Sequence, residues 1–357
     1  MPHPACRSRS EMESRGIVDS DLTKAVAAAC EFLVRHQDPD GHWRDYELPP
    51  GRSESWITGC VGVALDSAEV LLPPNSGRAR AVGRAVAALR DSQRPIGWGY
   101  NRKVSCDADS TSWVVRLIAT RDPEPSVAAG LFTDYITSTG GVRTFPSPAV
   151  FGSWANEHDE VAPMAGLALL ALGDKRTTGI IRAHTVSSYQ DHGRWLPFWW
   201  RSDAYVAAHN LTFLAFSGGI PPAIAAAERV RLSEAVGPAG RSSPAARESP
   251  FDTAHRLITA VRLGASGYVD LLRRALLAAQ LPDGGWPASL GLLVPGQRSP
   301  ATEIFADDRR LLSTAMAVQA LVDAATPRPT TTDKTASAVA QVGSSSAIFA
   351  DVLPADE

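Results

Sequence analysis

Two carboxyl groups separated by one residue stand at the start of an apolar stretch, Asp107 and Asp109 in the segment Asp-Ala-Asp-Ser-Thr. Neighbouring carboxyls disfavour double ionisation, and an apolar pocket raises the pKa of a carboxyl further. One of the two can therefore keep a proton near neutral pH and donate it as a general acid. The alternative is a structural cluster, because Asp and Ser residues commonly cap helix starts.

Aromatic residues near these carboxyls and before a later apolar helix could stabilise a carbocation. The π face of each ring contributes about 1–2 kcal/mol when water is excluded. A structural alternative applies to four tryptophans (43, 98, 195 and 286), which we expect to pack at repeated turns. The candidates for the cation pocket are Trp98, Tyr100, Trp113, Trp154, Trp199, Trp200 and Tyr205.

Arginines in the segments that precede apolar helices could hold an anionic head group, because guanidinium binds phosphate or carboxylate through paired hydrogen bonds. Ordinary surface charge is the alternative for each of them. Asp307 and Asp308 could pair with the arginines beside them or bind a metal. The basic candidates are Arg102, Lys103, Arg201, Arg309 and Arg310.

A repeated motif links these segments. A helical stretch runs into Gln, then a Gly turn, then Trp, at 37–43, 93–98, 190–195 and 280–286. The intervals between the glutamines are 56, 97 and 90 residues, and halving the two longer ones gives about one unit per 45–48 residues. A fifth copy begins at Gly140, where Phe145 replaces Trp, and the sixth has lost its motif inside 237–250.

Each unit consists of a helix with a charged face, the Gly turn and a second helix that is apolar nearly all round. The second helices belong inside and the first outside. Six such hairpins predict an all-α protein, an α6/α6 barrel, in which residues preceding the inner helices converge on one cavity. The predicted inner helices begin near good N-cap residues, namely Ser55, Ser110, Asp159, Asp203, Asp252 and Asp308.

Composition limits the classes of protein. The chain has 357 residues and a net charge of -3, so no basic balance indicates nucleic acid. No apolar run is long enough to span a bilayer, no secretory signal begins the chain, and four distant cysteines suggest reduced thiols in a cytoplasm. We expect a flexible arm over 1–20, one barrel over 21–326 with a loop at 237–250, and a disordered tail over 327–357.

The segment Gly-Trp-Gly-Tyr at 97–100, followed by Asp-Ala-Asp-Ser-Thr, resembles the signature of class II terpene cyclases such as squalene–hopene cyclases and bacterial copalyl-diphosphate-type enzymes. The Gln-to-Trp units and the segments 193–205 and 307–315 resemble that family too. The resemblance implies protonation of a linear isoprenoid and cyclisation through cations. Asp109 matches the proton donor and Asp107 the flanking acid. Ser110 departs from the commonest motif, which has a third Asp there, and His158, interpreted as an exposed loop residue, is only near the family's histidine.

The resemblance implies an isoprenoid substrate, either farnesyl or geranylgeranyl diphosphate or a meroterpenoid chain. Protonation needs no cofactor and no metal, whereas a diphosphate could use Mg²⁺. The family usually has two barrels, so a partner chain or a second copy could close the pocket of this single barrel. Alternatives are a barrel-type glycosidase and a cyclase-like barrel used for other chemistry or for ligand binding. Zinc-dependent prenyltransferases and lanthionine cyclases are disfavoured because no Cys follows Cys106.

Overall fold

The computed structural model describes residues 20–121, 129–237, 249–298 and 301–326. The predicted tail lies outside these residues, as do the predicted arm except Ser20 and most of the predicted loop at 237–250. Within the described ranges, every helix is too short or too polar to cross a lipid bilayer.

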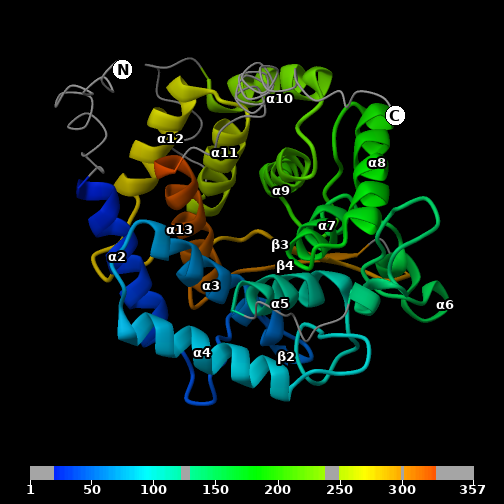
Figure 1. The fold of residues 1–357 in the computed structure, drawn as a ribbon, viewed down its shortest axis with the longest axis horizontal. Coiled ribbons are helices and arrows are strands. Elements are labelled where there is room, and N and C mark those ends of the chain that lie inside the picture. Colours follow the sequence, from blue (N-terminus) through cyan, green and yellow to red (C-terminus); the bar gives the residue numbers. More distant parts are fainter. Residues whose placement is uncertain (1–19, 122–128, 238–248, 299–300, 327–357) are drawn as a thin grey trace, which may run out of the picture.

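Six apolar helices form a closed inner ring (Figure 1). Each helix packs against the next one in the chain, and α13 packs back against α3. Their first residues lie within three positions of the predicted starts, so the barrel expected from the repeats is confirmed. The inner helices are α3 (Ser55–Ser67), α5 (Ala108–Arg121), α7 (Val161–Ala171), α9 (Asp203–Phe216), α11 (Pro250–Arg262) and α13 (Leu311–Ala325).

In the described part of the chain, five further helices surround this ring on the outside (Figure 1). In the third unit, the described residues before α7 contain only the 3-10 turns η2 (Ala129–Phe132) and η3 (Gly152–Ala155) and the short α6 (Pro148–Phe151). The turn η1 (Ala68–Val70) follows α3. The outer helices are α2 (Ser20–Arg35), α4 (Ser76–Asp91), α8 (Lys175–His192), α10 (Pro222–Val236) and α12 (Ser266–Ala278).

Two small antiparallel hairpins lie in loops before inner helices. Strands β1 (Glu47–Leu48) and β2 (Gly51–Arg52) precede α3. Strands β3 (Leu292–Pro295) and β4 (Thr302–Phe305) precede α13, with Leu292 opposite Phe305. The sequence did not predict these hairpins, because each strand is too short to show an alternating pattern.

The same glutamine hydrogen bonds recur in two of the turns and join one repeat unit to the next. The side-chain Nε2 of Gln37 donates to Gly41 O in its own turn and to Ala81 O in α4, both at 2.8 Å. Gln280 does the same with Gly284 O and Ala25 O, both at 2.9 Å. Because Ala25 belongs to α2, this last bond ties the sixth unit to the first and closes the outer ring.

The four turn tryptophans have the structural role that the sequence analysis gave as the alternative to cation binding. Each is buried and donates its Nε1 hydrogen to a carbonyl of the preceding outer helix, on Leu33, Leu89, Thr185 and Leu276 respectively. The backbone N–H groups of three of them donate to hydroxyls of inner-helix threonines, which the sequence analysis missed. These threonines are Thr58, Thr111 and Thr314.

The third unit corrects one detail of the repeat. The expected substitute for Trp was Phe145, but fully buried Val142 follows Gly140 by two residues, as Trp43 follows Gly41. Phe145 is half-buried and stacks on Phe151, with ring centroids 4.5 Å apart. The shorter Val therefore fills the turn position, and Phe145 joins a separate aromatic cluster.

Replacing Gly284 by Ala is expected to destabilise the barrel. Gly284 has a φ of 92°, and an added Cβ would lie 2.4 Å from Ala28 O of α2. The backbone strain alone costs about 1–3 kcal/mol. The free energy of unfolding, measured by urea titration, should fall by at least that amount. Gly83→Ala is the control, since exposed Gly83 lies inside α4 with nothing within 4 Å of the added Cβ. It should raise stability by up to about 1 kcal/mol; an equal response of both variants would contradict the packing argument.

Candidate active site

The two carboxyls of the signature have different structural roles. Asp107 caps α5: its Oδ1 accepts the Ser110 N–H at 2.6 Å and its Oδ2 accepts the Ser110 hydroxyl at 2.8 Å. Asp109, two residues on, makes no such cap. Its Oδ1 is buried and has no hydrogen-bond partner among the described residues. The capping interpretation therefore describes Asp107 and not Asp109.

The surroundings of Asp109 favour its protonated form. Burial is the largest cause that raises its pKa well above the usual value, and the nearby carboxyls of Asp107 and Glu160 raise it further. Arg116, two turns along the same helix, works in the opposite direction. Asp109 nevertheless keeps some accessible surface, so protein atoms do not cover this residue completely. Burial and the nearby carboxyls together favour the protonated carboxyl of Asp109.

Aromatic rings from opposite sides of the barrel meet in its interior. Trp113 of α5 lies edge-on to His209 of α9, with centroids 5.8 Å apart. Since α7 separates α5 from α9 in the ring, this contact crosses the interior. Trp200 stacks on Tyr205 at 4.2 Å and approaches Trp56 of α3 at 5.9 Å. Three predicted residues, Trp113, Trp200 and Tyr205, are thus brought together.

The other predicted aromatics lie elsewhere. Trp98 is 1% exposed and donates to Leu89 O of α4, so it lies between α5 and the outer layer and does not line the interior. Tyr100 is half-buried in the loop before α5 and donates its hydroxyl to Tyr46 O at 2.7 Å. Expecting Trp98 in the cation pocket was wrong because its ring fills the turn position of the repeat.

A second aromatic cluster, distinct from the interior rings, lies in the loops before α7 and α9. Trp199 is half-buried, donates to Thr144 Oγ1 at 3.0 Å and lies edge-on to Trp154 at 5.4 Å. Trp154 donates to Pro295 O of β3, which connects the cluster to the hairpin. Trp199 and Trp154 therefore belong to the loop end of the barrel and not to the same ring stack as Trp200.

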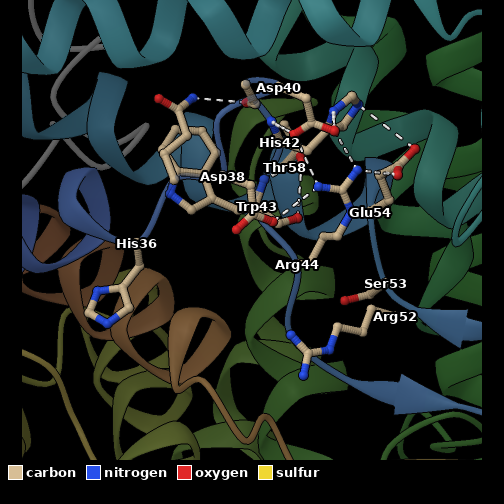
Figure 2. Close-up of polar contacts among 12 residues, drawn as sticks. His36, Asp38, Asp40, His42, Trp43, Arg44, Arg52, Ser53, Glu54 and Thr58 are labelled. Atoms are coloured by element: carbon tan, nitrogen blue, oxygen red, sulfur yellow. Dashed lines mark hydrogen bonds and ion pairs between the residues drawn. The ribbon is translucent and has the colours of Figure 1, made fainter.

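Charged residues fix the loops before α3 and α5. Figure 2 shows Arg44 between Asp38, Asp40 and Glu54; the bonds from Arg44 to these carboxylates are 2.6–3.0 Å long. Arg102 from the next unit also donates to Glu54, at 2.7 Å. Burial acts to raise the pKa of Glu54, but the bonds from both arginines hold it below its usual value. Glu54 is therefore a structural anion.

Three of the four arginines predicted to bind a head group are engaged by the protein, including Arg102, which donates to Glu54. Arg309 donates to Asp38, His36 O and Arg44 O of the first unit. Arg310 donates to Asp283 at 2.6 Å. Arg201 is exposed, in the segment before α9. In this arrangement Arg309 and Arg310 hold loops together and do not converge on one anion.

Asp307 is buried and structural. Its oxygens accept the N–H groups of Ser289 and Ser313 at 2.5 and 2.8 Å, and burial raises its pKa to about 7. Asp45 of the first unit accepts the N–H groups of Leu311 and Leu312 and so caps α13. Across the described ranges, no three His, Cys, Asp or Glu residues gather as a metal site would require.

The structure adds residues that the sequence analysis had not selected. Glu160 is buried before α7, accepts the N–H groups of Phe198 and Trp199, and has a pKa raised by burial to about 7. Its position beside the predicted helix start at Asp159 was the available signal. His158 is 8% exposed and stacks on Phe198 at 3.8 Å, so the exposed-loop interpretation was wrong. The aromatic loop cluster covers its ring.

Comparison with known proteins identifies solved structures that share this fold. No protein-family model and no curated protein matches the sequence. Among solved structures, the type II terpene cyclase MstE from Scytonema superposes with a TM-score of 0.73 and 24% identity, covering 85% of this chain and 98% of that one. A variant of MstE in complex with its substrate, geranylgeranyl dihydroxybenzoate, superposes with a TM-score of 0.71. A protein from Actinoplanes is 28% identical, with a TM-score of 0.70 over 85% of this chain and 100% of that one. An unsaturated glucuronyl hydrolase specific for heparin is more distant, with a TM-score of 0.58 and 16% identity. The chain therefore has a type II terpene cyclase-like α/α barrel.

Proposed function

We propose that this chain, with the barrel fold of the type II terpene cyclases, is a protonation-initiated cyclase of a linear isoprenoid. The observation that carries the proposal is the carboxyl of Asp109, which is surrounded by protein, has an unpartnered Oδ1 and adjoins the aromatic interior. Protonation of a terminal alkene by Asp109 would create a tertiary cation, which internal alkenes attack in turn. The rings of Trp113, Trp200 and Tyr205 would stabilise the positive charge in place of water.

The proposed substrate is a polyprenyl chain joined to an aromatic acid. MstE, which binds geranylgeranyl dihydroxybenzoate, supports this class, and its match over 98% of its length indicates that one barrel can hold such a chain. A diphosphate head group would bring Mg²⁺ with it. Of the two carboxyls predicted beside the arginines, Asp307 does not fit that ion, since it is buried and each of its oxygens accepts a backbone N–H.

Incubation with candidate substrates tests the proposal. Geranylgeranyl dihydroxybenzoate, geranylgeranyl diphosphate and farnesyl diphosphate are each supplied with and without Mg²⁺, and products are analysed by mass spectrometry and NMR. We expect a cyclised isomer of the first substrate that retains its head group, formed without Mg²⁺. Absence of cyclised product from all three substrates would contradict the proposal.

A glycosidase is the second candidate, because the heparin-specific hydrolase shares the fold. Glycoside hydrolysis generally uses two carboxyls, one on each side of the bond. Here Asp107 is bound to the start of α5, and Glu160 accepts two backbone N–H groups. The same assay with unsaturated glucuronyl disaccharides separates the two functions, and release of sugar would favour the hydrolase.

The pH dependence of the cyclisation is expected to have an alkaline limb set by Asp109. Its pKa is raised, so the active protonated form persists at neutral pH and is lost as the pH rises through that pKa. The ratio kcat/KM should therefore be level at neutral pH and fall on the alkaline side. Asp107→Asn keeps an oxygen for the cap but removes a carboxyl that raises the pKa of Asp109, so the limb should move to lower pH. A limb that stays in place in this variant would contradict the coupling.

A further inference from the structure

Two buried histidines in the barrel interior have an unpartnered ring nitrogen. His209 of α9 is 5% exposed and His255 of α11 is 0% exposed. The Nε2 atom of each has no hydrogen-bond partner in the described part of the chain. Their rings lie edge to face with centroids 5.5 Å apart, and both contact Tyr205. Leaving such an atom unpaired is costly, which suggests that a ligand uses it.

The hydrogen bonding of His255 fixes which nitrogen is basic. Its Nδ1 lies 2.7 Å from Phe251 O, one turn back in α11. A carbonyl oxygen can only accept, so Nδ1 carries the hydrogen and Nε2 keeps a free lone pair. Burial lowers the pKa of His255 to about 4, so the ring is neutral at neutral pH. The side chain therefore presents an uncharged proton acceptor.

His209 and His255 face the barrel interior, on the side opposite the proposed acid, Asp109. In the order of the ring, α11 is opposite α5, the helix that carries Asp109. The contact of His209 with Trp113 of α5 places the pair toward the interior and not toward the outer helices. Asp109 is the second residue of α5 and His255 the sixth of α11. At 1.5 Å per residue, His255 is about 6 Å further from the start of its own helix than Asp109 is from the start of α5.

We propose that His255 is the proton acceptor that ends the cyclisation, a role that rests on the proposed function. Cyclisation moves the positive charge along the chain, away from the carbon protonated first. A C–H bond beside the final cation then gives its proton to Nε2 of His255, and its electron pair forms the product alkene. The imidazolium returns that proton to water as product leaves, and Asp109 takes one from water. One proton is added and one removed, so substrate and product are isomers.

Variants at His255 test this assignment. His255→Phe keeps an aromatic ring, and His255→Gln keeps polarity and much of the volume. His192→Phe, at an exposed histidine of outer helix α8, is the matched control. Each is given geranylgeranyl dihydroxybenzoate in water enriched in oxygen-18, and products are quantified by mass spectrometry. Thermal unfolding shows which variants fold. Having two different replacements keeps the test valid when one of them fails to fold.

The expected result is a change of product at nearly unchanged substrate consumption, because protonation by Asp109 precedes the exit step. In both His255 variants the share of the wild-type alkene should fall about tenfold or more. Other double-bond isomers or alcohols containing oxygen-18 should replace it, while His192→Phe keeps the wild-type alkene as its main product. Wild-type product from folded His255 variants, or an equal loss of that alkene in His192→Phe, would overturn the assignment. A wild-type protein that cyclises nothing would overturn the proposed function itself, which is a distinguishable outcome.

Discussion

Asp109→Asn is expected to abolish cyclisation while leaving the fold intact. The amide has nearly the same shape but cannot act as the acid, and general acid catalysis contributes about 10²- to 10⁴-fold in rate. For an unactivated alkene the loss should lie at the upper end of this range. Steady-state assays with the substrate identified for the wild type would measure the loss.

Stability measurements separate this effect from misfolding. Asp109 makes no cap and its Oδ1 has no partner, so Asn removes no hydrogen bond from that oxygen and relieves the burial of an ionisable group. The free energy of unfolding should be equal to that of the wild type or higher. Asp191→Asn, an exposed carboxyl in outer helix α8, is the matched control and should keep full activity. Cyclisation by Asp109→Asn at the wild-type rate would remove the proposed mechanism.

Trp286→Ala is expected to cause the largest loss of stability. Trp286 is fully buried, and its Nε1 donates to Leu276 O of α12 at 2.7 Å, while its backbone N–H donates to Thr314 of α13. Its truncation leaves a cavity at the joint between inner and outer layers. It also removes one of the two hydrogen bonds that Leu276 O accepts, the other coming from Ala279 N–H at 3.2 Å. Large-to-small changes of this kind cost about 3–5 kcal/mol. Guanidinium titration followed by circular dichroism would give the free energy of unfolding.

Two further variants divide this loss into its parts. Trp286→Phe keeps a buried aromatic ring but loses the N–H donor and part of the ring volume. It should cost less than the Ala variant, with about 0.5–1.5 kcal/mol of the loss due to the hydrogen bond. Leu290→Ala changes an apolar side chain that is 58% exposed and should change stability by less than about 0.5 kcal/mol. If Trp286→Ala were no more harmful than Leu290→Ala, the turn tryptophan would not join the layers.

The sequence alone predicted the ring of helices because the same residue types recur in each marked unit, in addition to the regular spacing. Gln, Gly and Trp recur where each outer helix ends, and Gln37 and Gln280 make the same two bonds in different units. The pattern also located the acid motif at the start of an inner helix. The third unit was predicted less well, because Val142 fills its turn without the Trp that marks the others.

What the sequence determined was the order of the helices, the layer of each and the pair of candidate acids. Only the tertiary structure decided that Asp107 caps α5 while Asp109 stays free, and that His209 and His255 meet across from the acid. The physical reason is distance along the chain. Helix and layer follow from neighbouring residues, whereas the direction of a side chain depends on partners one or more repeats away, as Trp113 on α5 depends on α9.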